Sequence, residues 1–145
     1  MRFWPIVLAA AALGVFPVVA MAQQASFDLE LVSADSVDSK CSIILLAQNK
    51  LGSDIAQASF EVFIRGADKK LRGPYSFSFA AIANGKQKAK KFNLPDAVQS
   101  CDKIKKMMWN LFTVCKGDKD LTDLCNTAAN ISSSVDSIEF NNNAE

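Results

Sequence analysis

The chain of 145 residues has four cysteines and no histidine. The cysteines are the side chains best suited to forming disulfides or binding a metal. They are Cys41, Cys101, Cys115 and Cys125. An even number of cysteines in a chain that enters an oxidising compartment predicts two disulfides. A zinc site is the alternative, but such sites usually need closely spaced Cys or His pairs, and the chain has no C-x-x-C.

The same composition argues against catalysis. Without histidine there is no ordinary Ser-His or Cys-His nucleophile, and no side chain that titrates unperturbed near neutral pH. Cysteines held in disulfides cannot act as nucleophiles either. A paired-carboxylate or Ser-Lys site stays open in principle, but no spacing indicates one, so we expect no enzyme, no catalytic residue and no cofactor.

Lysines form the densest charged cluster of the chain. Four of them lie close together and three more follow within the segment 86–106: Lys86, Lys88, Lys90 and Lys91, then Lys103, Lys105 and Lys106. Such a cluster can bind an anion. On a strand, lysines more often keep an exposed sheet edge from pairing with other chains, or form a solvated face. We prefer the edge interpretation and keep anion binding as the alternative.

A short acidic run tempts a calcium assignment. Asp118, Asp120 and Asp123 stand in the sequence DKDLTD. An EF-hand loop needs oxygen ligands at alternate positions, a glycine at the sixth and a glutamate at the twelfth, and this run lacks them beyond its first two acids. Helix capping explains the run more simply, so no metal site is predicted.

The N-terminus indicates export. Residues 1–22 carry an early positive charge at Arg2, an apolar run from Ile6 to Val19 and the cleavage-type sequence Ala20-Met21-Ala22, which together predict a signal peptide. A membrane anchor is the alternative, but the apolar run is shorter than the ~20 residues that span a bilayer. We expect a periplasmic or secreted protein that is not stably inserted in a membrane.

The mature chain predicts one domain at 23–140 and a loose tail at 141–145. Removing Arg2 lowers the sixteen basic residues to fifteen, which equals the fifteen acidic residues. A net charge near zero gives no general attraction to nucleic acid or anionic lipid, so neither is an expected partner.

The stretch from Cys41 to Arg65 predicts two strands joined by a polar turn at 49–53, which we interpret as a hairpin. The first strand is almost wholly apolar, and the second alternates, with Ala58, Phe60, Val62 and Ile64 on one face. Phe63 lies on the opposite, polar face. It is the aromatic residue predicted to be exposed, and therefore a candidate contact for a partner.

Further strands are predicted from alternation and turn residues at 26–32, 75–81, 86–94, 107–114 and 135–140, with short helical turns near 100–106 and 120–129. A polar turn is expected at 34–40 and a tight turn at Asn84-Gly85. About seven strands without a long helix predict an all-β fold, an immunoglobulin-like antiparallel sandwich.

Strand order bears on the disulfides. In a Greek key, the second strand pairs antiparallel with the fifth, which brings Cys41 close to Cys101. Cys115 ends the sixth strand at the other pole, some ~20 Å away, beyond the Cα separation that a disulfide tolerates. Cys41–Cys101 and Cys115–Cys125 are therefore the favoured pairs among three possible connectivities.

A family resemblance rests on the segment AQNKLGSDIAQASFEVFI, on Phe92-Asn93-Leu94-Pro95 before Cys101, and on Asn110 before Cys115. The chain resembles the FxLYD-like immunoglobulin-type domains of bacterial exported proteins, and a group of uncharacterised small periplasmic proteins of alphaproteobacteria. It departs from their usual Phe-Asp-x-x-Gly turn at 63–70, where it reads FIRGADKK. The resemblance implies a β-sandwich and supplies no catalytic residue.

Two functions follow as expectations. The first is a protein interaction or structural module of the cell envelope, whose partner is another envelope protein. The second is a periplasmic protein that binds a small ligand or anion through the lysines of 86–106.

Overall fold

The structure is a computed structural model that describes residues 13–17 and 24–142. Most of the predicted signal peptide at 1–22, including its cleavage site, lies outside the described residues, as do residues 143–145. Residues 13–17 form neither helix nor strand. No helix in the described part of the chain is long and apolar enough to cross a bilayer.

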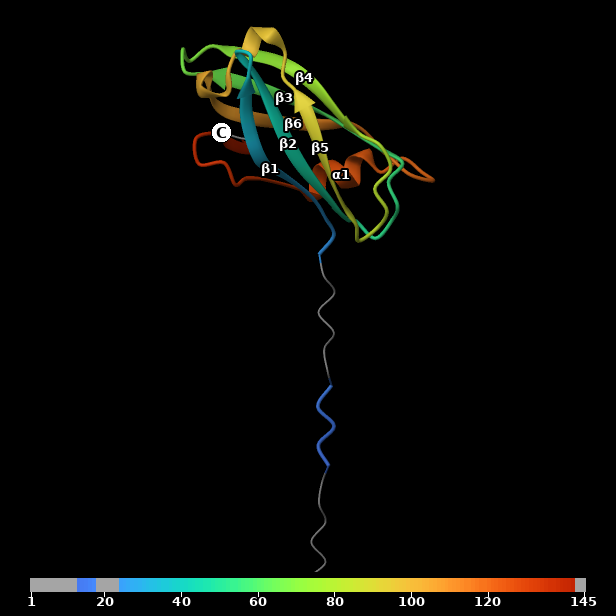
Figure 1. The fold of residues 1–145 in the computed structure, drawn as a ribbon. Coiled ribbons are helices and arrows are strands. Elements are labelled where there is room, and N and C mark those ends of the chain that lie inside the picture. The colour runs from blue at the N-terminus through green and yellow to red at the C-terminus, as the bar shows by residue number, and fades with distance from the viewer. Residues whose placement is uncertain (1–12, 18–23, 143–145) are drawn as a thin grey trace, which may run out of the picture.

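Two four-stranded sheets pack face to face and confirm the predicted all-β sandwich (Figure 1). The first sheet has the order β5-β2-β1-β7 and contains β1 (Ser26–Val37), β2 (Lys40–Lys50), β5 (Gln87–Asn93) and β7 (Ala129–Ser133). The second has the order β4-β3-β6-β8 and contains β3 (Gln57–Gly66), β4 (Leu71–Phe79), β6 (Ile104–Lys116) and β8 (Glu139–Asn142). Three short helices complete the described fold: the 3₁₀ turns η1 (Asp96–Val98) and η2 (Cys101–Lys103), and α1 (Thr122–Ala128).

The predicted hairpin from Cys41 to Arg65 is wrong, because β2 and β3 belong to different sheets. Both strands turn an apolar face inward, so crossing from one sheet to the other buries the two faces against each other. The connection is fixed by the side chain of Asn49, which is fully buried. Its Nδ2 donates to the carbonyl oxygens of Ser53 (2.8 Å) and Ile82 (2.9 Å), and its Oδ1 accepts from the amide of Leu51 (3.0 Å).

The sequence had predicted purely antiparallel sheets, but both sheets are mixed. Strands β1 and β7 pair in parallel, and so do β6 and β8, whereas the other four pairs are antiparallel. Strand β7 was not predicted, because its five residues, ANISS, contain little apolar alternation. It brings the strands in the described residues to eight.

Element boundaries also shift. The predicted last strand at 135–140 lies at Glu139–Asn142, so residues 141 and 142, expected to belong to a loose tail, are part of a strand. The rest of the expected tail, 143–145, lies outside the described residues. Strand β1 runs on to Val37, which shortens the predicted polar turn at 34–40 to Asp38 and Ser39, both with positive φ. The turn at Asn84-Gly85 is confirmed, but it joins strands of opposite sheets.

Phe60 lies at the centre of the core, and the predicted inward face of β3 is buried as expected. Its ring centroid lies 5.9 Å from that of Phe77, 6.3 Å from that of Phe79 and 5.7 Å from that of Phe112. Phe92 of β5 packs edge-on against Phe77 at 5.0 Å, which joins the two sheets along one side.

Both predicted disulfides are confirmed, as is the antiparallel pairing of β2 with β5 on which the first one rested. Cys41–Cys101 ties the start of β2 to η2, and Cys115–Cys125 ties the end of β6 to α1. Two disulfides indicate an oxidising, extracytoplasmic environment.

Candidate functional site

Lys88 and Lys90 reach from the edge of one sheet to the edge of the other. The Nζ atom of Lys90 donates to the carbonyl oxygen of Ser78 (2.7 Å), and that of Lys88 to the carbonyl oxygen of Ala81 (3.4 Å). The ammonium of Lys90 also lies 5.1 Å from the centroid of the Phe92 ring, a cation–π distance. Because β4 and β5 are both edge strands, these contacts favour the edge-protecting interpretation.

The other lysines of the segment 86–106 do not join these two. Lys91 follows Lys90 in β5 and therefore points to the opposite face of the sheet. Lys86 lies between the Asn84-Gly85 turn and the start of β5. Lys103 belongs to η2, and Lys105 and Lys106 belong to β6 in the other sheet. Proximity in sequence therefore does not produce a single anion-binding surface.

Phe63 lies on the outward face of β3, as predicted, but it is half-buried rather than fully exposed. Its cross-strand partner is Met108, and the neighbouring outward pair is Glu61 with Leu111. Met108 is buried, whereas Leu111 is 39% exposed. We call these four residues the Phe63 surface.

The acidic run 118–123 has a structural role. The Asp120 carboxylate accepts hydrogen bonds from the amide (2.9 Å) and hydroxyl (2.6 Å) of Thr122, and these bonds lower the pKa of Asp120. It thereby binds the first amide of α1, which agrees with the capping interpretation, although Leu121 holds the N-cap position. On α1, Leu124 is 38% exposed. Among residues 13–17 and 24–142 no group of three or more His, Cys, Asp or Glu side chains is arranged to hold a metal ion.

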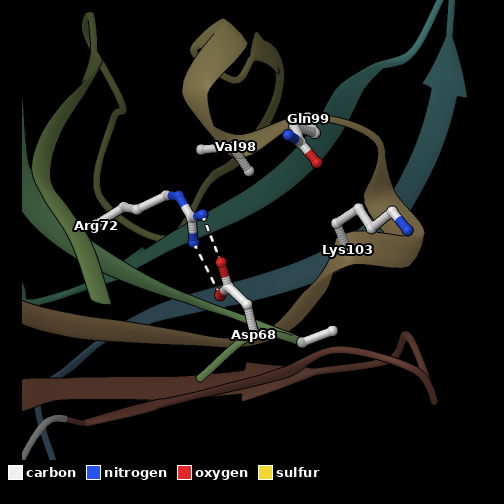
Figure 2. A pocket seen from close by; sticks show the side chains of 6 residues that line it. Asp68, Arg72, Val98, Gln99 and Lys103 are labelled. Atoms are coloured by element: carbon white, nitrogen blue, oxygen red, sulfur yellow. Dashed lines mark hydrogen bonds and ion pairs between the residues drawn. The ribbon is translucent and has the colours of Figure 1, made fainter. Parts of the chain in front are cut away.

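A cavity that the sequence did not predict lies at the pole that carries the β3–β4 turn and the helical turns (Figure 2). Its volume is about 370 Å³, and it is lined by Ala67, Asp68, Arg72, Val98, Gln99 and Lys103. A backbone hydrogen bond from the amide of Ala67 to the carbonyl oxygen of Lys103 (2.8 Å) holds the two segments together. We call this site the polar cavity.

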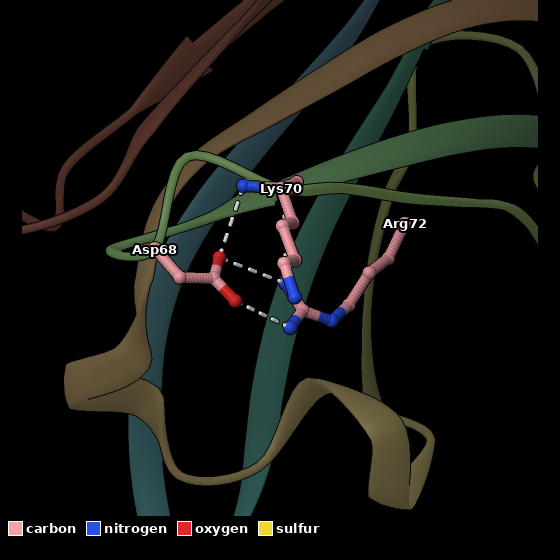
Figure 3. A network of polar contacts seen from close by, with 3 residues as sticks. All are labelled: Asp68, Lys70 and Arg72. Carbon is pink, nitrogen blue, oxygen red and sulfur yellow. Dashed lines mark hydrogen bonds and ion pairs between the residues drawn. The ribbon is translucent and has the colours of Figure 1, made fainter.

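Asp68 and Arg72 form an ion pair on one wall of the polar cavity (Figure 3). Nη2 of Arg72 donates to Oδ2 of Asp68 (2.8 Å), and Nη1 donates to Oδ1 (3.3 Å). The amide of Lys70 donates to the same Oδ1 (3.0 Å). The hydrogen bond from Arg72, followed by that from Lys70, lowers the pKa of Asp68 to about 2, and the pair raises the pKa of Arg72.

Gln99 has an unusual backbone for a residue with a side chain. Its φ is 67° and its ψ is −151°, a combination that is otherwise almost restricted to glycine. Its amide donates to the carbonyl oxygen of Asp96 (3.1 Å), which closes η1 and turns the chain toward η2. Its side chain lines the polar cavity together with that of Lys103 (Figure 2).

Sequence reasoning missed Asp68, Arg72 and Gln99. One signal was present, because the segment RGADKKLR at 65–72 carries four basic residues and overlaps the segment 63–70, where the sequence differs from the Phe-Asp-x-x-Gly turn expected from the resemblance. No signal marked Gln99, whose distinction lies in its backbone angles. No family model, curated protein or solved structure matches this chain.

Proposed function

We propose that this chain is an exported periplasmic protein, with a signal peptide at 1–22 followed by an immunoglobulin-like sandwich, and that it is a non-catalytic interaction or structural module of the cell envelope. The partner is another envelope protein. The observation that carries this proposal is the Phe63 surface, where an aromatic and a leucine face outward from a sheet.

The chemistry of the Phe63 surface suits a protein partner. Phe63 and Leu111 supply apolar area next to the buried Met108, and the charged Glu61 lies beside them. Protein interfaces combine an apolar, often aromatic centre with a polar rim in this way. Single aromatic side chains at such centres often carry a large part of the binding free energy.

The non-catalytic part of the proposal rests on the residue inventory. The chain has no histidine, and the described structure holds all four cysteines in disulfides. The usual nucleophile and base pairs therefore cannot be assembled.

Binding from envelope extract tests the proposal. The mature chain, residues 23–145, is immobilised as wild type, as Phe63→Ala and as Leu124→Ala, a matched truncation of an exposed apolar residue on α1. We expect one specific envelope protein to be retained by wild type and Leu124→Ala, and lost with Phe63→Ala. Retention should persist between about 0.1 M and about 0.5 M salt, because a packed apolar contact is little screened.

The same experiment examines the alternative function, anion binding by the lysines of 86–106. Binding that weakens steeply with salt, and with Lys88→Glu combined with Lys90→Glu, would favour that alternative. Specific retention that is equal for Phe63→Ala and wild type would contradict the role of the Phe63 surface.

A further inference from the structure

We propose that the polar cavity binds a small organic monocarboxylate, which Arg72 and Lys103 recognise by charge and Gln99 by its amide. The cavity uses other side chains than the Phe63 surface. Carboxylate binding therefore goes beyond the interaction role and does not depend on it.

Arg72 is held in place with one edge of its guanidinium group left over. The group has five N–H donors in a fixed plane. Its hydrogen bonds to described residues go from Nη1 and Nη2 to Asp68, and from Nη1 to the carbonyl oxygen of Lys70 (3.4 Å). The edge formed by Nε–H and the second Nη2–H has no acceptor in the described part of the chain. Two parallel N–H groups of this kind match the two oxygens of a carboxylate.

Asp68 pre-organises this edge. It binds the other edge of the guanidinium group and is itself oriented by the amide of Lys70. A donor that is already oriented loses little conformational entropy when the ligand arrives. The arginine side chain is consequently a better receptor than a freely moving surface arginine.

The charge of the polar cavity fits a single negative charge. Arg72 and Lys103 contribute two positive charges and Asp68 one negative charge, which leaves one net positive charge. None of the ion pairs between described residues uses Lys103. A dianion such as phosphate would place its second charge near Asp68, where like charges repel.

The remaining lining fits a short apolar chain and a polar head. Val98 is buried at the wall, and Ala67 lies in the turn that faces it. A cavity of about 370 Å³ is within the usual size of small-molecule sites. Gln99 supplies an amide that can donate to a carboxylate oxygen, from a backbone conformation of the strained kind that often occurs at ligand sites.

Amide chemical shifts in ¹H–¹⁵N spectra of the mature chain test the proposal, with butyrate, acetate, butyramide and inorganic phosphate as probes. We expect butyrate to shift the amides of Ala67, Gln99 and Lys103, and to bind more tightly than acetate by about fourfold for each methylene group that is buried. Butyramide has the same shape without the charge and should not bind. Phosphate binding as tight as that of butyrate would overturn the assignment to monocarboxylates.

Three variants and a control separate recognition from folding. Arg72→Lys keeps the charge but cannot offer the two-donor edge, and should weaken butyrate binding about tenfold. Lys103→Gln leaves the ion pair of Asp68 with Arg72 intact and should weaken butyrate binding about threefold. Gln99→Gly should raise the thermal midpoint by relieving strain, yet weaken binding. Lys88→Gln, a control on β5 outside the polar cavity, should leave the affinity for butyrate unchanged. Absence of butyrate-induced shifts at the cavity, or unchanged affinity in both Arg72→Lys and Lys103→Gln, would refute the proposal.

Discussion

Replacing Asn49 by alanine should reveal how the chain crosses between the sheets. Asn49 is fully buried at the end of β2, where the connection to β3 begins. Its side chain makes three hydrogen bonds to main-chain groups, of Leu51, Ser53 and Ile82. Alanine removes all three bonds and leaves those groups to find other partners.

The expected loss follows from these bonds. A protein hydrogen bond contributes roughly 1 kcal/mol net, and a buried group left without a partner costs about 1 to 3 kcal/mol. The amide of Leu51 is buried, so it stays without a partner. The carbonyl oxygen of Ser53 is closer to water, so it can accept a hydrogen bond from water and recover part of the lost free energy. We therefore expect Asn49→Ala to lower the free energy of unfolding by about 3 kcal/mol, which is a large part of the stability of a single domain.

Urea denaturation followed by tryptophan fluorescence measures this loss. With a slope of about 1.5 kcal/mol per molar urea, the midpoint should fall by about 2 M. Gln48→Ala is the matched control, because it removes one exposed hydrogen bond, to Gln87, and should cost less than about 0.5 kcal/mol. A loss below about 1 kcal/mol for Asn49→Ala would refute the view that this side chain fixes the crossover.

Three further predictions concern the disulfides, the sheet edge and the ion pair. The bridges close loops with sequence separations of 60 and 10, so removing Cys41–Cys101 should cost about 4 kcal/mol and removing Cys115–Cys125 about 3 kcal/mol by denaturation. When Cys115–Cys125 is removed, hydrogen exchange should show lost protection mainly at 116–132, and an equal loss of protection across the domain would contradict this prediction. Lys90→Glu should lower stability by about 1 kcal/mol, since it removes the bond to Ser78, whereas Lys91→Glu on the other face should change it little. In an NMR titration the carboxyl group of Asp68 should have a pKa of about 2, returning toward 3.8 in Arg72→Ala. Because the folded pKa is depressed, the stability contributed by this pair is present above about pH 4 and is lost as the pH falls toward 2; an unshifted pKa would show that the pair does not form.

The parts of the fold that could be predicted are those encoded by local alternation. In β3, every second residue is apolar, as at Phe60, Val62 and Ile64, and the face that carries these side chains is buried. The disulfides followed from one correct pairing, that of β2 with β5. A polar turn such as 49–53, however, suits a hairpin and a crossover equally. Which sheet a strand joins depends on contacts far away in sequence, as with Asn49 and Ile82.

The site could be predicted less well. Phe63 could be predicted as a candidate contact because one aromatic residue broke the alternation, whereas its neighbours Met108 and Leu111 on β6 were not predicted to lie beside it. The polar cavity joins residues 67–72 with residues 98–103, two segments linked by the hydrogen bond from the Ala67 amide to the carbonyl oxygen of Lys103, while the Cys41–Cys101 bridge holds η2. Neither contact leaves a local pattern. The lysines of 86–106 show the converse, since residues adjacent in sequence are distributed over both sheets.

Site-specific photo-crosslinking in cells tests directly whether the Phe63 surface contacts another envelope protein. A photoreactive amino acid is placed at position 63, and in a matched strain at position 124 on α1. We expect one discrete crosslinked product, containing a second envelope protein, from position 63 and none from position 124. No product from position 63, or the same product from both positions, would contradict it.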